Sequence, residues 1–507
     1  MTIPVGIDLG TTFSAIARID EQGRPQTLFN AEGDRTTPSV ILFEGEDVIV
    51  GKEALKAIAT DAPLIAECAK RDIGRSRFRH KVDGADYRPE VLEAVILNKL
   101  HRDALEQIGP FTDVVITAPA YFDEVRRKAT QDAGYMAGLR VLDIINEPTA
   151  AAIAYAYEHG FLLPDASSST MNRTFLVYDL GGGTFDVTIM RAEGAVFTTL
   201  ATDGDVQLGG RDWDDRILDL VAERFIDQQG EDFRQDLEAV ARIRQVCEEA
   251  KRTLSLREKA TIHCDYRGRT AKIEMTRQEF ESATIDLLDR TRFTSQQTLK
   301  AAGLDWADID TILAVGGSTK MPMVCRMLRE LTGREPDASI SPEEAVAQGA
   351  ALHADQLLRR SQGKTPAFLV RNVNSHSLGV VGVDPETQRP RCGFLIPKNT
   401  PLPVRARRRF FTKDEGQSSI IVQVVEGESR DPYACTLLGR CVVKHLPPNL
   451  PAQTEIIVDF SYKENGRLKI KVGVPGVNTE VCTELVRENG ISHEELNAWR
   501  ARLTQRE

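Results

Sequence analysis

The chain lacks the features that mark membrane proteins, zinc proteins and secreted proteins. No apolar run approaches the length of a membrane span. The eight cysteines include no Cys-x-x-Cys pair, which favours buried or free thiols in a reducing compartment over a zinc site. The N-terminus runs directly into the strand-like segment 3–9 and leaves no room for a signal peptide. These absences predict a soluble, cytoplasmic protein with no membrane contact.

An excess of basic residues is also missing. The formal net charge is −11 and the sequence pI is about 5.5, which argues against a general nucleic-acid binder. The hydrophobic content of 41% is that of a globular protein. A chain of 507 residues is too long for one core and predicts about three folding units.

Two segments far apart in the chain repeat one arrangement of residues. Val5-Gly-Ile-Asp-Leu-Gly-Thr-Thr12 and Phe175-Leu-Val-Tyr-Asp-Leu-Gly-Gly-Gly-Thr-Phe-Asp186 each run from an apolar strand through an aspartate to a glycine turn and a threonine. Glycine has no Cβ, so such a turn can bring backbone N–H groups against phosphate oxygens. One such turn is usually only a hairpin. Two near-copies predict a duplicated fold that closes two phosphate loops on one nucleotide.

Strands and helices alternate along the first two-thirds of the chain. Strands are predicted at 114–118 and 311–315, and a surface loop at Asp165–Asn172. Helices are predicted at 123–138, from Glu147 onward, at 236–256, and from Ser341-Pro-Glu-Glu to about Arg360, with a proline in the first turn of the second and fourth.

The pattern changes after residue 360. Ser361–Pro366 has the composition of a linker, and the short apolar patch Phe368-Leu-Val370 follows it. Strand-like runs then extend over 377–383, 405–411, 419–425, 435–443, 455–462 and 468–474, separated by turns such as Lys413-Asp-Glu-Gly and Lys463-Glu-Asn-Gly. They predict an all-β domain of about a hundred residues. Beyond it, only Ser492–Leu503 looks helical.

Seven ordered segments carry a resemblance to a known family. They are Gly6-Ile-Asp-Leu-Gly-Thr-Thr, Lys70-Arg-Asp-Ile-Gly-Arg, Ile116-Thr-Ala-Pro-Ala-Tyr-Phe, Asn146-Glu-Pro-Thr-Ala-Ala, Asp179-Leu-Gly-Gly-Gly-Thr-Phe-Asp, Leu208-Gly-Gly and Val315-Gly-Gly-Ser-Thr. With them, the chain resembles the DnaK-type 70-kDa heat-shock chaperones. The glycine loops alone would also fit actin or a sugar kinase, but the Asn-Glu-Pro segment and the β domain favour the chaperone.

This resemblance implies a fold and its division into domains. An α/β actin-like ATPase domain, duplicated and two-lobed, is expected over residues 1–364, and an interdomain linker over 365–372. An all-β sandwich that binds peptides is expected over 373–478. A short helical remnant of the family's lid is expected over 479–507.

The resemblance further implies that the protein is an ATPase that binds ATP or ADP with Mg²⁺. Phosphoryl transfer to water needs donors, a cation and a positioned water molecule. The implied catalytic residues are Lys70, Glu147, Asp186 and Thr184, with Lys70 against the γ-phosphate. A solvated surface lysine is the ordinary alternative for Lys70, and an acid at a helix N-terminus is the alternative for Glu147.

The remaining site residues follow the same resemblance. Asp8 and Asp179 would hold Mg²⁺ largely through water. The nucleotide would be bound by Gly10, Thr11, Thr12, Phe13, Gly182, Gly183, Glu248, Lys251, Arg252, Ser255, Gly317, Ser318 and Lys320. The family usually has arginine where Lys320 stands, and lysine lacks the planar guanidinium that stacks on adenine, so weaker nucleotide binding is expected.

Communication between domains is expected to involve Pro119, Arg127, Leu369 and Val370. A turn residue and a surface charge are the plain alternatives for Pro119 and Arg127. The linker keeps the family's apolar character but loses its acidic flanks. The expected partners are unfolded or extended polypeptides, a J-domain co-chaperone and a nucleotide-exchange factor.

The peptide pocket is expected at Val380, Phe410, Ile420 and Val422, with Arg467 where the family has an apolar residue. The run Arg405-Ala-Arg-Arg-Arg-Phe-Phe places alternate arginines on one strand face. A solvated outer face of the sheet is the leading explanation of these arginines. A preference for acidic peptides is the second explanation, and nucleic-acid binding is the last.

These features predict an ATP-dependent chaperone whose peptide affinity is coupled to ATP hydrolysis. Because the helical lid is short, fast peptide release is expected. The alternative is a nucleotide-gated regulator or scaffold with one native client and little turnover. A sugar kinase is a distant third, since it leaves the β domain unexplained.

Overall fold

The computed structural model describes residues 3–162, 171–384, 386–412, 415–444, 446–447, 449–463, 468–475, 480–484 and 490–505, with the backbone alone for 480–484. Most of the predicted Asp165–Asn172 loop lies outside these ranges, as do Arg467 and parts of the turns predicted after Lys413 and Lys463. Among the described residues, no helix combines the length and the apolarity needed to cross a bilayer.

The first large sheet contains the first glycine turn. Its strand order is β3-β2-β1-β8-β9, with β4 paired to β2. β1 is antiparallel to β2 and parallel to β8, which is parallel to β9. The members are β1 (Val5–Asp8), β2 (Phe13–Ile19), β3 (Pro25–Thr27), β4 (Thr37–Pro38), β8 (Asp113–Ala118) and β9 (Arg140–Asn146).

The second large sheet repeats this arrangement around the second glycine turn. Its order is β15-β10-β11-β12-β16, and β10 is antiparallel to β11 and parallel to β15. β1 and β10 therefore have equivalent neighbours. Each has an aspartate at or next to its last residue, Asp8 or Asp179, and is followed by a glycine turn. The members are β10 (Asn172–Leu180), β11 (Phe185–Glu193), β12 (Val196–Asp205), β15 (Thr311–Val315) and β16 (Leu369–Arg371).

Two alanine-rich helices, α4 (Glu147–Glu158) and α10 (Ala345–Ser361), pack together between the sheets. Their alanines share one apolar core with residues of β2, β8, β10, β11 and β15. The backbone approach is close enough that a Cβ built on Gly6 would lie 2.1 Å from the backbone N of Ala351. Small side chains are thus what allow the two sheets to be joined.

The predicted start of α10 was wrong. The backbone N–H groups of Glu344 and Ala345 both donate to the Ser341 carbonyl, so Pro342–Glu344 forms a turn and the helix begins at Ala345. The Pro342 carbonyl accepts from the N–H of Gly316, which ties this turn to the glycine turn after β15.

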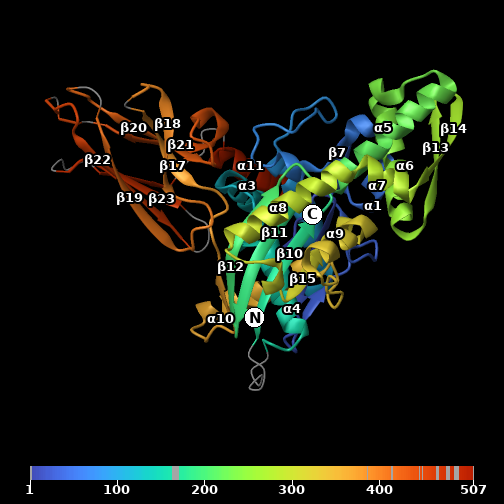
Figure 1. The fold of residues 1–507 in the computed structure, drawn as a ribbon, viewed down its shortest axis with the longest axis horizontal. Coiled ribbons are helices and arrows are strands. Elements are labelled where there is room, and N and C mark those ends of the chain that lie inside the picture. The colour runs from blue at the N-terminus through green and yellow to red at the C-terminus, as the bar shows by residue number, and fades with distance from the viewer. Residues whose placement is uncertain are drawn as a thin grey trace.

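The other helices of this part lie around the two large sheets and two smaller ones (Figure 1). They are α1 (Lys52–Ala57), α2 (Pro89–Ile108), α3 (Glu124–Met136), α5 (Gly210–Gln229), α6 (Leu237–Leu256), α7 (Arg277–Ala283), α8 (Ile285–Ala301) and α9 (Pro322–Thr332). One small sheet contains β5 (Val40–Glu44), β6 (Asp47–Val50) and β7 (Ile65–Glu67). Another contains β13 (Lys259–Tyr266) and β14 (Arg269–Thr276). Short 3-10 turns include η2 (Ala69–Asp72), η5 (Gly317–Lys320) and η6 (Pro432–Ala434).

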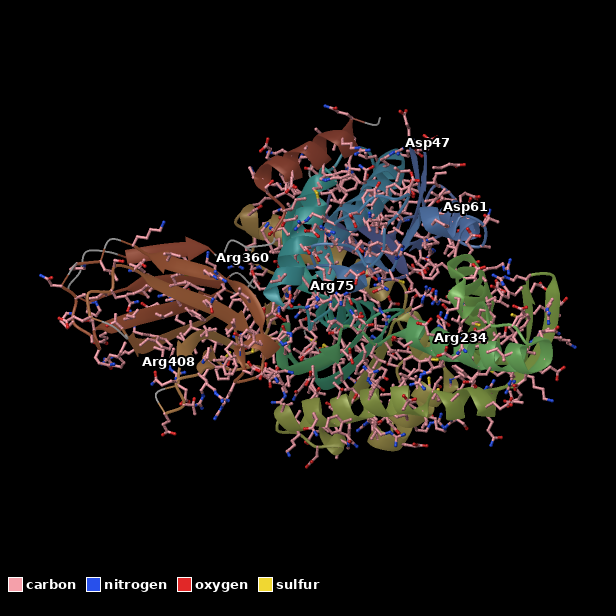
Figure 2. All side chains as sticks on the ribbon, turned by 90° about the horizontal axis from the view of Figure 1, so that it is seen from above. Asp47, Asp61, Arg75, Arg234, Arg360 and Arg408 are labelled. Carbon is pink, nitrogen blue, oxygen red and sulfur yellow. The ribbon has the colours of Figure 1, made fainter. Side chains whose placement is uncertain are left out.

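The strands between residues 378 and 484 form two four-stranded sheets, ordered β18-β17-β20-β21 and β19-β22-β23-β24. Their inward side chains share one core, which includes Val424, Val458 and Phe460. The strands are β17 (Leu378–Val383), β18 (Pro390–Ile396), β19 (Val404–Phe411), β20 (Ile420–Glu426), β21 (Thr436–Val443), β22 (Glu455–Tyr462), β23 (Leu468–Gly473) and β24 (Glu480–Glu484). We call the described residues from 373 to 484 the β-rich part and residues 3–364 the N-terminal part. From above, the two extend to opposite sides, with Arg408 in one and Arg234 in the other (Figure 2).

Two of these strands were missed by the sequence reading. β18 contains Pro390 and Gly393, which weaken a strand pattern. β24 pairs with β23 and lies beyond residue 478, inside the region that was expected to be a helical remnant.

The last helix, α11 (His493–Thr504), closely matches the helix predicted at 492–503. It packs on α2 and α3 of the N-terminal part, where Leu496 joins the apolar core. The Tyr135 hydroxyl donates to Asn497 Oδ1 at 2.6 Å, and the Arg500 guanidinium lies 4.5 Å from the Tyr135 ring centroid.

The contact between α4 and α10 leaves no room for a side chain at Gly349. A Cβ there would lie 1.8 Å from the Ala150 carbonyl oxygen, so Gly349→Ala forces the two helices apart. We expect a loss of about 2 kcal/mol or more, despite the higher helix propensity of alanine. Gly382→Ala is the control, because nothing lies within 4 Å of its Cβ position. Differential scanning calorimetry of both variants measures the loss, and equal transition temperatures would contradict this packing.

Candidate nucleotide site

A cavity of about 480 Å³ opens between the two glycine turns. Residues from both large sheets and from α6 line it. Of the residues predicted to bind nucleotide, metal or the attacking water, it brings together Asp8, Gly10, Thr11, Thr12, Phe13, Lys70, Glu147, Asp179, Gly182, Thr184, Glu248, Lys251, Arg252, Ser255, Gly317, Ser318 and Lys320. Two of the predicted residues, Gly183 and Asp186, do not line the cavity themselves.

The two glycine turns touch each other directly. A Cβ on Gly182 would lie 2.3 Å from Thr12 Cγ2, and one on Gly183 would lie 2.3 Å from Thr11 Cγ2. Any larger residue would therefore separate the turns. The absence of side chains here leaves backbone N–H groups and threonine hydroxyls at the cavity wall, which is the chemistry that binds phosphate.

Lys70 and Glu147 form a buried ion pair at the floor of this cavity. Lys70 lies on η2 and Glu147 opens α4, and the Nζ–Oε1 distance is 2.7 Å. Their exposed fractions are 3% and 6%, so Lys70 is not the solvated surface lysine of the plain alternative. Burial opposes the charged ammonium, but the Glu147 and Asp8 carboxylates outweigh it and raise the pKa of Lys70.

Three aspartates surround this pair. Burial and the charge of Glu147 raise the pKa of Asp8 to about 7 and that of Asp186 to about 8, and the pKa of Asp179 is raised well above its ordinary value by the same causes. Asp8 accepts from the Thr117 hydroxyl at 2.9 Å, and Asp186 from the Tyr121 N–H at 2.8 Å. The site thus holds more buried carboxylates than cations.

This excess of acid groups fits a divalent cation, which would favour their ionised forms. Among the described residues, no three or more histidine, cysteine or acidic side chains stand close enough to hold a metal ion directly.

The four residues predicted on α6 share one face and reach the cavity. Lys251 Nζ donates to the Gly210 carbonyl at 2.8 Å and pairs with Asp214 at 2.8 Å. Arg252 pairs with Glu248 at 2.6 Å, and its guanidinium lies 5.7 Å from the Phe13 ring centroid. The Arg252 guanidinium is therefore a planar cation on this wall of the cavity, and it can stack on a flat aromatic ring.

Lys320 stands at the opposite wall and is half exposed. Its Nζ pairs with Glu343 Oε1 at 2.5 Å, so the ammonium is directed to the turn before α10. The neighbouring Ser318 hydroxyl donates to the Gly181 carbonyl at 2.9 Å and links the third glycine turn to the second.

Arg71 supports the second glycine turn and was not identified from the sequence. Its Nε donates to the Gly183 carbonyl at 2.9 Å, it pairs with Asp212, and it is 7% exposed. Arg71 follows Lys70 within the motif Lys70-Arg-Asp-Ile-Gly-Arg, so the motif pointed to this position. The motif alone does not indicate that the arginine is buried.

Glu93 is a second residue that sequence reasoning missed. It lies on α2 inside the apolar run Val91-Leu-Glu-Ala-Val-Ile-Leu97 and is 1% exposed. Its Oε2 has no hydrogen-bond partner among the described residues. Burial raises the pKa of Glu93 to about 8, and the Lys70 ammonium opposes this shift only in part.

The predicted linker is bound as an added strand of the second sheet. β16 pairs in parallel with β12, and the Leu369 N–H donates to the Ala195 carbonyl at 2.8 Å. The preceding Phe368 is buried, and its N–H donates to Gln356 Oε1 at 3.0 Å. Val370 packs on the central core, whereas Leu369 is 44% exposed.

The β-rich part also contacts the turn that follows Pro119. Lys398 Nζ lies 2.9 Å from Asp203 Oδ2 and 4.7 Å from the Tyr121 ring centroid. His376 bonds the Tyr121 carbonyl at 3.0 Å. Pro119 is buried and accepts from the Phe122 N–H at 3.1 Å, so it closes the turn that meets the β-rich part.

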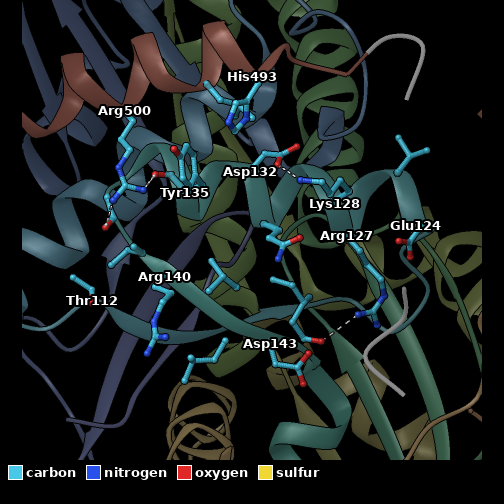
Figure 3. A pocket seen from close by; sticks show the side chains of 18 of the residues that line it. Thr112, Glu124, Arg127, Lys128, Asp132, Tyr135, Arg140, Asp143, His493 and Arg500 are labelled. Carbon is cyan, nitrogen blue, oxygen red and sulfur yellow. Dashed lines mark hydrogen bonds and ion pairs between the residues drawn. The ribbon is translucent and has the colours of Figure 1, made fainter. Parts of the chain in front are cut away.

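Arg127 extends from α3 toward the end of β9 (Figure 3). Its guanidinium donates to the Ile144 carbonyl at 3.3 Å and to the Asn146 side chain. It therefore bonds the residue directly before Glu147. It also lines a cavity of about 740 Å³ whose other walls include Leu438 and Leu468 of the β-rich part.

The four predicted peptide-pocket residues lie in one cluster. Val380, Ile420 and Val422 are buried in the core of the β-rich part, and Phe410 packs against it. On β19, Arg405, Arg407 and Arg409 are exposed on one face. Arg407 pairs with Asp459 and Arg409 with Glu455 on β22, so this run is the solvated outer face.

Known proteins resemble this chain over nearly its whole length. The family model described as Hsp70 protein matches residues 4–501. "Chaperone protein DnaK" of Deinococcus proteolyticus is 38% identical over 500 residues, which covers 93% of this chain and 76% of that protein. The proteins of the same name from Thermosipho africanus and Halobacterium salinarum are 36% identical over 501 and 500 residues, covering 97% of this chain and 81% and 76% of theirs.

The raised pKa of Glu93 makes stability depend on pH. The folded protein keeps this proton up to about pH 8, whereas the unfolded chain loses it near its ordinary pKa of 4.5. Stability from Glu93 is therefore complete at low pH and is lost as pH rises from about 4.5 to 8. We expect Glu93→Gln to flatten the fall in Tm over this range and to raise the stability at pH 8 by on the order of a few kcal/mol. Exposed Glu53→Gln is the control, and parallel Tm–pH curves for both variants would contradict the assignment.

Proposed function

Because the chain belongs to the Hsp70 family, we propose that the cavity between the glycine turns binds ATP with Mg²⁺ and that hydrolysis there controls peptide binding by the β-rich part. Family membership makes the protein an ATP-dependent chaperone and an ATPase. The observation that carries the assignment of the site is the buried Lys70–Glu147 pair between two glycine turns and three acids.

The proposed architecture is a duplicated, actin-like ATPase domain over residues 1–364. The equivalent neighbours of β1 and β10 support the duplication. The two four-stranded sheets with a common core support a β-sandwich peptide-binding domain from residue 373, with its last strand extending past 478. The linker over 365–372 then includes β16.

In this proposal the phosphates bind the backbone N–H groups and hydroxyls at Gly10–Phe13 and Gly182–Thr184. The ring of the nucleotide lies along α6, near Arg252 and Ser255, with Ser318 and Lys320 opposite. Lys320 is already paired with Glu343, so it contributes little to binding the base. Asp8 and Asp179 would hold Mg²⁺ through water, and the cation would neutralise charge on the phosphates.

Lys70 is the group placed to act in hydrolysis. Its ammonium lies at the cavity wall and is charged, so it can bind the γ-phosphate and orient the attacking water. Glu147 holds Lys70 in place at 2.7 Å. Thr184 lines the cavity together with Lys70, so its side-chain oxygen can bond that water. Asp186 does not line the cavity but is close enough to Glu147 and Lys70 for their charges to shift its pKa.

Two connections lead from this site to the β-rich part. Arg127 bonds Asn146, directly before Glu147, and lines the cavity shared with Leu438 and Leu468. Pro119 closes the turn whose Tyr121 meets both Asp186 and His376. A change in charge at the nucleotide site can therefore displace elements that contact the peptide-binding domain.

The clients are unfolded or extended polypeptides, as the family implies. A J-domain co-chaperone, a nucleotide-exchange factor and a cytoplasmic location complete the proposal. The relatives do not favour the alternative of a nucleotide-gated regulator. Fast peptide release is part of the proposal, because in the described residues α11 packs on α2 and α3 of the N-terminal part.

The first test is single-turnover ATP hydrolysis in Mg²⁺ by the wild type and by Lys70→Ala. Loss of the ammonium should reduce the rate by about 10²–10³, the usual effect of removing one group that stabilises a transition state. ATP binding should remain, since the glycine turns are unchanged. Lys52→Ala is the control, because Lys52 is exposed and pairs with Asp34 away from the cavity lining. An unchanged rate in Lys70→Ala would exclude the proposed role.

The docked linker gives a second prediction. A carboxylate in Val370→Asp cannot pack on the central core. We expect basal hydrolysis to persist, while its acceleration by a generic hydrophobic peptide falls at least several-fold. Exposed Arg371→Ala should retain this acceleration. Steady-state phosphate release with and without peptide measures both variants, and full acceleration in Val370→Asp would show that β16 does not carry the coupling.

A further inference from the structure

Two cysteines of the β-rich part lie against each other although they are far apart in the chain. Cys392 is on β18, Cys435 directly precedes β21, and their Sγ atoms are 3.9 Å apart. Both are free thiols. The sulfurs of a disulfide are about 2 Å apart, so bond formation would bring these two atoms closer by about 2 Å.

The segment 427–435 brings Cys435 to Cys392. β18 and β21 are opposite edges of their sheet, and this segment connects β20 to β21. The Gly427 N–H donates to the Ser377 carbonyl at 3.0 Å, just before β17. The Cys392 N–H then donates to the Arg430 carbonyl at 2.9 Å. These two backbone hydrogen bonds hold the segment next to the starts of β17 and β18, and so keep Cys435 beside Cys392.

The two thiols differ in their access to solvent. Cys392 is 5% exposed, and burial raises the pKa of its thiol to about 12. Cys435 is partly exposed, and its Sγ donates only a weak bond to the Ser429 carbonyl at 3.2 Å. A reagent from solvent therefore meets Cys435 first, because thiol reactivity follows exposure and thiolate character.

We propose that Cys392 and Cys435 are a modification site, which a small disulfide such as oxidised glutathione converts to a reversible internal disulfide. The Cys435 thiolate attacks one sulfur of the oxidant, forms a mixed disulfide and releases the first glutathione as a thiolate. Cys392 then loses its proton to solvent and attacks Cys435 Sγ, and the second glutathione leaves. Two electrons pass to the oxidant, and the two protons lost by the protein balance those taken up by two glutathione thiols.

The bond restrains a segment that supports the contact with the N-terminal part. Within segment 427–435, the Glu428 carboxylate accepts from the Ser377 N–H at 2.9 Å and the Ser377 hydroxyl at 2.8 Å. The same hydroxyl accepts from the Lys398 N–H at 2.9 Å, and Lys398 pairs with Asp203 on β12. Oxidation therefore fixes the loop that holds this interface.

The test treats the full-length native protein with oxidised glutathione and then with N-ethylmaleimide, followed by peptide mapping by mass spectrometry. We expect one cross-linked peptide that joins Cys392 and Cys435, with loss of two hydrogen atoms, and its disappearance with dithiothreitol. Hydrogen exchange should slow across 428–435 in the oxidised protein. The variant Cys325→Ser is the control, since Cys325 is also partly exposed but lies on α9; it should form the same cross-link.

Two further variants establish the order of attack. Cys392→Ser should stop at a glutathione adduct on Cys435, whereas Cys435→Ser should acquire adduct on Cys392 at least ten-fold more slowly. No cross-linked peptide in the native wild type would overturn the proposal, and this outcome does not depend on how well either variant folds. Faster adduct formation on Cys392 than on Cys435 would overturn the assigned order.

Discussion

The buried ion pair between Lys70 and Glu147 is the interaction on which the rest of the site depends. An unpaired charge at this depth would cost several kcal/mol, so each partner requires the other. Their 2.7 Å contact also joins η2 to the start of α4, the helix that packs between the two large sheets. Around this pair the carboxylates of Asp8, Asp179 and Asp186 exceed the available positive charge. A site with this imbalance is suited to a nucleotide that arrives with a divalent cation.

The proposed coupling to the β-rich part depends on where that pair lies. Glu147 comes directly after the residue bonded by Arg127, and Asp186 accepts from the N–H of Tyr121, whose ring and carbonyl meet the β-rich part. The linker is not a free tether, because β16 extends the second sheet beside β12. The same sheet thus carries the second glycine turn and the linker. These contacts connect the walls of the nucleotide cavity with residues that touch the β-rich part.

Much of this organisation could be predicted from the sequence because its signals are local. Glycine turns after apolar strands and the alternating pattern of β22 depend only on neighbouring residues. Other features depend on tertiary contacts. Glu93 resembles a surface acid until α2 is packed beside Lys70, and β18 was missed because Pro390 and Gly393 interrupt its pattern. Pro342–Glu344 forms a turn instead of the start of a helix, and the Pro342 carbonyl accepts from the N–H of Gly316, a contact distant in sequence. The packing of α11 on Tyr135 had no local signal.

A double-mutant cycle on Lys70 and Glu147 tests the central claim most directly. Single-turnover ATP hydrolysis is measured for Lys70→Ala, Glu147→Gln and the double variant in saturating Mg²⁺ and ATP. If the two side chains act as one unit, the double variant loses little more than the more damaging single variant. Independent losses that multiply in the double variant would show that the two residues contribute separately, and would contradict the account of this pair as the unit that positions the attacking water.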